Sequence, residues 1–139
     1  MKNIPIGQIL VENGFLKEDQ LEEALEKQRS EPGKKLGDVL LELGYVSETQ
    51  LAQALSIRLK VPFIDLTTTK IDIEAVKKIP EAIAKKNCCV AFQMNDSRLT
   101  VATDDPINFY IFEELKVISG MEIHAMIATR TAINETISK

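Results

Sequence analysis

The stretch IPIGQILVENGFLKEDQLEEAL, residues 4–25, is repeated in altered form as GKKLGDVLLELGYVSETQLAQAL, residues 33–55. The two copies place identical residues thirty positions apart, beginning with Gly7 and Gly37. The other identical pairs are Leu10 and Leu40, Glu12 and Glu42, Gly14 and Gly44, Glu18 and Glu48, Gln20 and Gln50, Leu21 and Leu51, Ala24 and Ala54, and Leu25 and Leu55. Such a repeat indicates one structural unit that is written twice and packs against its copy.

Each copy predicts a helix, a glycine and a second helix. Apolar residues recur at helical spacing, and Gly14 and Gly44 follow them where a left-handed C-terminal cap is needed. Ser47 and Gln50 fit a capping box at the start of the second helix of the second copy. The first copy has Lys17 in place of the serine, so its second helix should begin less sharply. We therefore expect a helical lobe over residues 1–60.

The pattern changes after Val61 and predicts a small α+β lobe over residues 61–139. Residues 61–66, VPFIDL, read as a short extended segment. Three strands are expected over residues 88–94, 98–103 and 121–127, the first two joined as a hairpin by a turn at 95–97. Helices are expected over 72–87 with a break at Pro80, from Asp105 and Pro106 to about Ile118 with a stop at Gly120, and after a cap at Thr129. The fold class is therefore α+β.

Composition excludes several classes of protein. The chain has 139 residues and a formal net charge of −4, which gives no electrostatic reason to expect nucleic-acid binding. The N-terminus lacks the apolar run of a signal peptide, and no stretch approaches the roughly 20 apolar residues of a membrane-spanning helix. We therefore expect a cytoplasmic protein that does not span the membrane.

The cysteines and the histidine give no sign of metal or redox chemistry. Cys88 and Cys89 are adjacent, strand geometry would point them to opposite faces, and no second Cys or His pair accompanies them. Both are expected to be small buried side chains. His124 lies between apolar neighbours and is expected to be a half-exposed strand residue. No metal or required cofactor is expected.

The repeated glycines Gly7 and Gly37 fall in the first turn of a helix, where glycine costs about 1 kcal/mol relative to alanine. A glycine there would let a ligand approach the backbone, and free N–H groups at a helix N-terminus favour phosphate. Two such turns could hold a ligand with two phosphates. The alternative is that the two hairpins only pack on each other.

The tandem motif, in which Leu-Gly after a basic residue leads through a second Gly to a closing Gln, resembles the N-terminal domain of type II secretion and type IV pilus assembly ATPases. VPFIDL and the Asp-Pro helix at residues 104–120 are also similar to that family, so the resemblance covers the whole chain. The module, called MshEN, can bind the second messenger cyclic di-GMP in that family. The resemblance therefore implies a possible cyclic di-GMP site.

Carried over residue by residue, the match is incomplete. The family's stacking arginine is replaced by Pro5 and Lys35, and the closing glutamine is kept as Gln28 but replaced by Arg58. Lysine keeps the charge and loses the flat guanidinium surface. The site residues that the resemblance implies are Ile6, Gly7, Leu10, Gln28, Lys35, Leu36, Gly37, Asp38, Leu40, Arg58 and Asp105. Asp38 or Asp105 could accept hydrogen bonds from the Watson–Crick edge of guanine.

Two functions stay open at this point. One is a docking domain that contacts the inner-membrane platform of a secretion or pilus machine and the ATPase core that the resemblance implies should follow. The other is a functional cyclic di-GMP-binding module. Catalysis is not expected, because no GxxxxGK[ST] phosphate loop occurs and no Ser, His and Asp set is present. A helix-turn-helix DNA reader is disfavoured by the net acidity and by the lack of a basic recognition helix.

Overall fold

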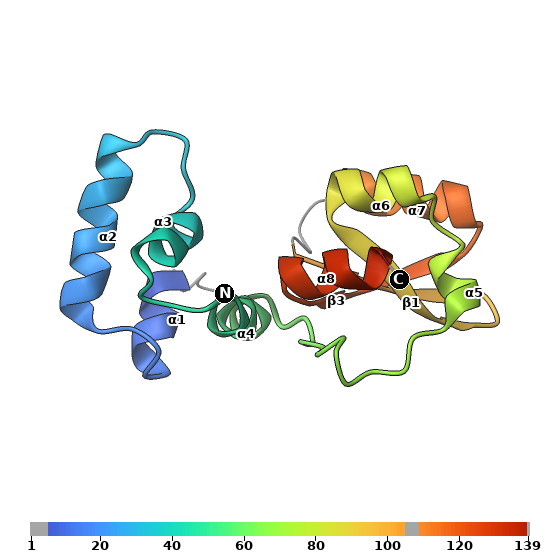
Figure 1. Ribbon diagram of the computed structural model, residues 1–139, viewed down its shortest axis with the longest axis horizontal. Coiled ribbons are helices and arrows are strands. Elements are labelled where there is room, and N and C mark those ends of the chain that lie inside the picture. The colour runs from blue at the N-terminus through green and yellow to red at the C-terminus, as the bar shows by residue number, and fades with distance from the viewer. Residues whose placement is uncertain (1–5, 105–108, 139) are drawn as a thin grey trace. The chain divides into compact units, whose positions relative to one another are not determined.

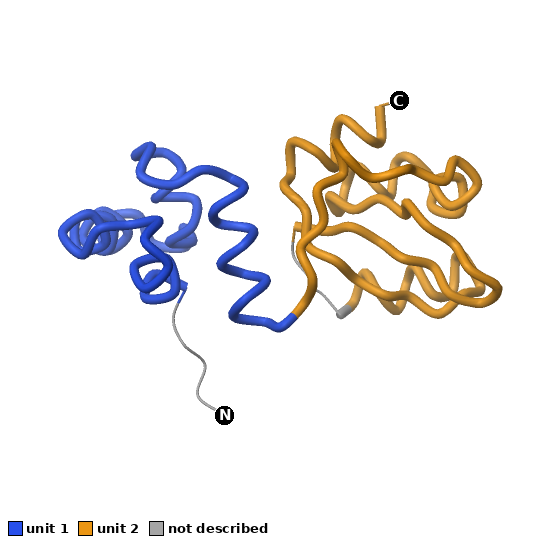
Figure 2. Tube along the Cα trace, turned by 90° about the horizontal axis from the view of Figure 1, so that it is seen from below, with its two compact units in different colours: residues 1–60 blue, residues 61–139 orange. Residues whose placement is uncertain are grey.

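The structure of the protein is a computed structural model that describes residues 6–104 and 109–138. The chain divides into two compact units, Met1–Lys60 and Val61–Lys139, which Figure 2 colours separately. Each unit has its own core of buried apolar side chains. No helix in the described ranges combines the length and the apolar character that crossing a bilayer requires.

Unit 1 contains four helices (Figure 1). They are α1 (Ile6–Glu12), α2 (Glu18–Ser30), α3 (Leu36–Leu43) and α4 (Glu48–Leu59). Gly14 and Gly44 have φ of 76° and 75°, which confirms the predicted left-handed caps. Ser47 Oγ accepts from the Gln50 N–H at 3.1 Å, and Gln50 Oε1 accepts from the Ser47 N–H at 3.0 Å, so the capping box is also confirmed.

The two copies interlock. Helix α1 packs mainly on α4, and α2 packs mainly on α3, so each first helix lies against the second helix of the other copy. The packing is the same for both copies: α1 and α3 occupy equivalent positions, and so do α2 and α4. The core shared by the four helices is formed by Ile9, Leu10, Leu16, Ala24, Val39, Leu40, Val46 and Ala54. The repeat therefore builds one pseudo-symmetric unit.

Unit 2 is an α+β unit around one three-stranded sheet. Its elements are α5 (Ile73–Val76), α6 (Glu81–Asn87), β1 (Cys89–Asn95), β2 (Arg98–Thr103), α7 (Phe109–Ser119), β3 (Glu122–Ile127) and α8 (Arg130–Ile137). Strand β1 pairs antiparallel with β2, and β2 pairs parallel with β3 through the connection that contains α7. The predicted extended segment lies beside β3, where Phe63 bridges Ile127 in parallel.

The predicted turns of unit 2 are mostly confirmed. Pro80 precedes α6, Gly120 ends α7 with φ of 69°, and the Thr129 hydroxyl accepts from the Ala132 N–H at 3.2 Å. The predicted helix start at Asp105 and Pro106 lies outside the described residues.

The two cysteines differ from the prediction. Cys88 precedes β1 and has φ of 49° at the left-handed end of α6, so strand alternation does not apply to it. Cys89 is fully buried as expected, whereas Cys88 is only half-buried.

Candidate functional site

The first-turn glycines of unit 1 make room for leucine side chains. A Cβ atom at Gly7 would lie 2.6 Å from Leu21 Cδ1, and one at Gly37 would lie 3.0 Å from Leu51 Cδ2. Leu21 and Leu51 are equivalent positions of the two copies. Packing alone thus accounts for glycine at both positions. Access of a ligand to the backbone at these glycines stays a prediction, and it is not needed to explain their presence.

The four apolar site candidates with side chains lie in the core of unit 1 or pack against it. Leu10 and Leu40 have no exposed surface. Ile6 and Leu36 are partly buried and pack against the same core cluster. Their side chains therefore hold α1 and α3 in place, and Leu10 and Leu40 cannot touch a ligand without a rearrangement of the helices.

The polar candidates near the start of α3 come from both copies of the repeat. Gln28 near the end of α2 donates from Nε2 to the Lys34 carbonyl oxygen at 3.0 Å, in the loop that leads into α3. Lys35 follows as the exposed N-cap of α3, and Asp38 lies partly buried in its first turn. The structure thus brings Gln28, Lys35 and Asp38 to one end of the α2–α3 pair.

A network of ion pairs, which the sequence pattern did not indicate, connects α2, the loop after it and α3. Lys34 Nζ is bonded to Glu42 and lies 3.8 Å from Glu31 Oε1, while Lys27 Nζ lies 3.7 Å from Glu42 Oε2. The hydrogen bond with Glu42 raises the pKa of Lys34, and the same bond lowers the pKa of Glu42. Glu42 has an identical counterpart in the first copy, Glu12, whereas Lys34 has no lysine counterpart there. This difference between the copies is the only signal in the sequence that could have pointed to the ion pair of Lys34 and Glu42.

The structure describes only some of the remaining candidate residues. Arg58 lies exposed in the last turn of α4, at the position that Gln28 occupies in α2. Helix α4 packs on α1 as α2 packs on α3, so the repeat makes Arg58 the counterpart of Gln28. Pro5 and Asp105 lie outside the described residues. Among the described candidate residues, the polar groups are therefore two exposed cations, Lys35 and Arg58, together with the Asp38 carboxylate and the Gln28 amide.

No cluster of His, Cys, Asp and Glu side chains suited to a metal ion occurs in residues 6–104 and 109–138. His124 is half-exposed, as predicted, and its Nε2 lies 3.2 Å from Glu122 Oε1. Burial raises the pKa of the Cys88 thiol to about 12 and that of Cys89 to about 11, with Asp104 acting in the same direction.

Comparison with known proteins finds relatives along the whole chain. The chain is 29% identical over 134 residues to the type IV pilus assembly ATPase PilB of Myxococcus xanthus (strain DK1622), an alignment that covers 96% of this chain and 24% of the relative. It thus spans about a quarter of the length of that curated relative.

Two solved structures share the fold. The structure of MshE with cdg superposes with a TM-score of 0.80 at 33% identity and covers 97% of each chain. The N-terminal domain of XpsE superposes with a TM-score of 0.71 at 22% identity, covering 99% of this chain and 97% of that one, and this likeness concerns the fold alone. Both confirm the α+β architecture.

The sequence model of the MshEN domain family matches residues 59–139, which is unit 2 with the last two residues of unit 1. The resemblance noted from the tandem motif therefore has independent support in the other unit. Because the match covers more than half of the chain, the protein belongs to the MshEN domain family.

Proposed function

We propose that this chain is a non-catalytic, cytoplasmic N-terminal regulatory and docking domain of a type II secretion or type IV pilus assembly ATPase, and that its helical unit binds cyclic di-GMP. The observation that carries the proposal is the likeness to MshE with cdg, at 33% identity over 97% of each chain. The similarity to about a quarter of the length of a type IV pilus assembly ATPase supports the proposal that the chain is part of such an ATPase.

The side chains at the interlocked ends of unit 1 suit such a ligand. Cyclic di-GMP carries two phosphates and two guanines, so it needs cations and groups that read a base edge. Lys35 and Arg58 are exposed and supply positive charge. The Asp38 carboxylate can accept from guanine N1–H and N2–H₂, and the Gln28 Oε1 remains as an acceptor while Nε2 holds the Lys34 carbonyl.

Affinity should be limited by the missing guanidinium groups. A cation over an aromatic face contributes about 0.5 to 2 kcal/mol, and lysine lacks the flat surface that stacks on a base. We therefore expect Lys35→Arg to tighten binding by about 2- to 30-fold, the equivalent of that energy range. The same change should leave the unfolding transition nearly unchanged, because the Lys35 side chain is exposed.

Calorimetric titration of cyclic di-GMP into the chain tests the proposal, with cyclic di-AMP and GTP as specificity controls. Asp38→Ala and Arg58→Ala should weaken binding at least about tenfold, the cost of one lost charge-assisted hydrogen bond. Lys17→Ala is the matched control, because Lys17 is exposed at the opposite end of α2 from Gln28. Heat that is insensitive to both site variants, or equal for cyclic di-AMP, would remove the second-messenger function.

The docking part of the proposal is favoured by the exposed face of α7. Tyr110 and Val117, two turns apart on that helix, are 92% and 83% exposed. Large apolar side chains that gather on one helix face mark interaction surfaces. The partners implied are the inner-membrane platform protein and the ATPase core.

A photo-crosslinking amino acid at Val117, introduced into the full-length ATPase in cells, tests docking. It should yield a covalent adduct with the platform protein or an intramolecular product with the ATPase core. The same probe at Ile57, which is 52% exposed on α4 in the other unit, is the matched control. Equal products from both positions, or none from Val117, would contradict docking through α7.

A further inference from the structure

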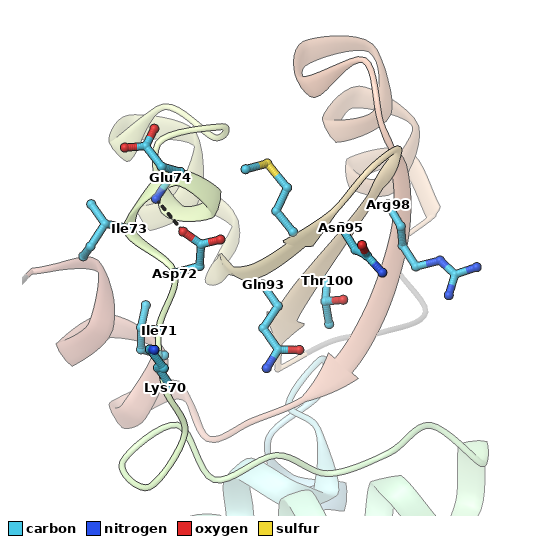
Figure 3. A pocket seen from close by; sticks show the side chains of 10 residues that line it. Lys70, Ile71, Asp72, Ile73, Glu74, Gln93, Asn95, Arg98 and Thr100 are labelled. Carbon is cyan, nitrogen blue, oxygen red and sulfur yellow. Dashed lines mark hydrogen bonds between the residues drawn. The ribbon is translucent and has the colours of Figure 1, made fainter.

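A groove of about 850 Å³ lies in unit 2, and none of the candidate residues considered so far lines it. One wall is the segment that leads into α5, and the other is the β1–β2 hairpin (Figure 3). Its lining consists of Lys70, Ile71, Asp72, Ile73, Glu74, Gln93, Met94, Asn95, Arg98 and Thr100. The groove is therefore built by two segments that are distant in sequence and joined at one edge of the sheet.

The hairpin contributes a polar face to the groove. Gln93 is the register partner of Thr100, and Asn95 is the register partner of Arg98, so these four side chains share one face of the sheet. Leu99, which alternates to the opposite face, is fully buried. Gln93, Asn95 and Arg98 are exposed. At its hairpin end the sheet thus buries its apolar face and leaves this polar face uncovered.

The donors of the groove have no partners within the part of the chain that the structure describes. Neither Lys70 nor Arg98 forms an ion pair or a hydrogen bond there, and the side chains of Gln93, Asn95 and Thr100 form none either. All five side chains can donate a hydrogen bond, and two of them are positively charged. They offer an acceptor-rich ligand several donors at once.

The acidic groups nearby are already engaged. Asp72 Oδ1 accepts from the Glu74 N–H at 3.0 Å as the cap of α5, and Glu74 Oε1 lies 3.8 Å from Lys77 Nζ. Figure 3 shows the Glu74 side chain directed away from the hairpin wall. On β3, Glu122 stands beside Arg98 in register, and its carboxylate lies 3.2 Å from His124 Nε2. The lining thus holds two cations and two carboxylates, and Lys70 and Arg98 are the charged side chains that have no partner among the described residues.

Apolar and backbone groups complete the surface. Ile73 is 58% exposed at the segment wall, where a partner's apolar side chain could cover it. Strand β1 forms an edge of the sheet, and the Phe92 carbonyl already accepts from the Asp72 N–H at 2.9 Å. An edge strand presents backbone groups to any extended chain that lies beside it. The shape and chemistry suit a polypeptide in extended conformation.

We propose that this groove binds an extended acidic segment of a partner protein, with its carboxylates on Lys70 and Arg98 and an apolar side chain on Ile73. The inference rests on the proposed docking role and assigns it a second surface, distinct from α7. Carboxylates are the acceptors that pair best with an ammonium and a guanidinium group. Association through such a patch should weaken as salt rises.

Nuclear magnetic resonance titration of the ¹⁵N-labelled chain tests the groove without the ATPase or the platform protein. The probe is a capped peptide of alternating Glu and Val, compared with a Lys and Val peptide, a Glu and Ser peptide, and an oligonucleotide of equal charge. We expect saturable shifts at residues 70–74, 93–95 and 98–100 with the Glu and Val peptide only. A failed crosslink at Val117 would leave this result intact, so the two proposals fail separately.

The double variant Lys70→Gln and Arg98→Gln should weaken the peptide at least about tenfold, as expected for two lost charge-assisted contacts. Lys85→Gln with Lys86→Gln is the matched control, since both lysines are exposed on α6 outside the groove and the charge change is the same. Shifts that survive the groove variant, that vanish equally in the control, or that the Glu and Ser peptide or the oligonucleotide reproduces would overturn the proposal. An absence of saturable shifts would overturn it as well.

Discussion

Gly7 and Gly37 look identical in the sequence but differ in how tightly a leucine covers them. A methyl group at Gly7 would lie 2.6 Å from Leu21 Cδ1, whereas one at Gly37 would lie 3.0 Å from Leu51 Cδ2. Overpacking costs about 1 to 3 kcal/mol, and alanine recovers about 1 kcal/mol of helix propensity. We expect Gly7→Ala to lower the free energy of unfolding by about 1 kcal/mol, and Gly37→Ala to change it by less than about 0.5 kcal/mol.

Urea unfolding followed by circular dichroism measures both changes. The clash also predicts a coupling: Leu21→Ala should cost at least about 1 kcal/mol less in the Gly7→Ala background than in the wild type, because the added methyl group fills part of the space that the leucine leaves. Equal effects of the two glycine substitutions, or additive effects of Gly7→Ala and Leu21→Ala, would contradict the packing explanation.

The two cysteine thiols should make stability depend on alkaline pH. Burial raises the pKa of Cys88 to about 12 and of Cys89 to about 11, from an ordinary value of 9.0. A raised pKa in the folded state contributes stability that is complete below the unfolded value and is lost as pH rises through the folded values. We therefore expect the free energy of unfolding to fall between about pH 9 and pH 12.

Iodoacetamide reports the same property at neutral pH, because it reacts with the thiolate. At pH 8 the folded chain should be alkylated at least about a hundredfold more slowly than free cysteine, and Cys88→Ser should remove part of the alkaline pH dependence. Rapid labelling of Cys88 in the folded state would contradict the raised pKa of its thiol.

The roles of individual residues were the least predictable from the sequence. Leu10 and Leu40 matched the family motif, yet they are core side chains, and a motif cannot distinguish a residue that holds a helix from one that touches a ligand. The bond from Gln28 to the Lys34 carbonyl could not be predicted either, because it depends on how the spacer between the copies folds back.

At the scale of elements, the repeat supplies its own control for helix capping. Ser47 accepts from the Gln50 N–H, but Lys17, its counterpart, has no side-chain acceptor, and only the Gln20 side chain closes that turn at 3.0 Å. Ser47→Ala should lower the free energy of unfolding by about 1 kcal/mol, and Lys17→Ala should leave it nearly unchanged. Thermal unfolding measures both, and equal losses would show that the serine hydroxyl does not cap α4.

Helices, strands and their ends were largely predictable, since glycine, proline and capping residues act within a few positions. The three strands, the hairpin turn and the stop at Gly120 all follow from such local signals. The interlocking of α1 with α4 and of α2 with α3 was not predictable, because both copies carry the same apolar stripe and either pairing would bury it.

At the scale of the whole chain, the α+β class and the family follow from the sequence, and the comparisons confirm both. The tandem motif lies in residues 4–55, and the family model matches residues 59–139, so two separate parts of the chain point to one family. Ligand binding does not follow in the same way, because Pro5 and Lys35 replace the residues whose chemistry the family uses.

We propose that the ends of α2 and α4, with the starts of α1 and α3, form one cyclic di-GMP site. Titration of the ¹⁵N-labelled chain with cyclic di-GMP tests this site, because it locates the ligand residue by residue. We predict saturable chemical-shift changes at the starts of α1 and α3 and around Gln28 and Arg58. All of these signals should follow one binding event with the same stoichiometry. Shifts confined to other residues, or none at millimolar ligand, would contradict the claim.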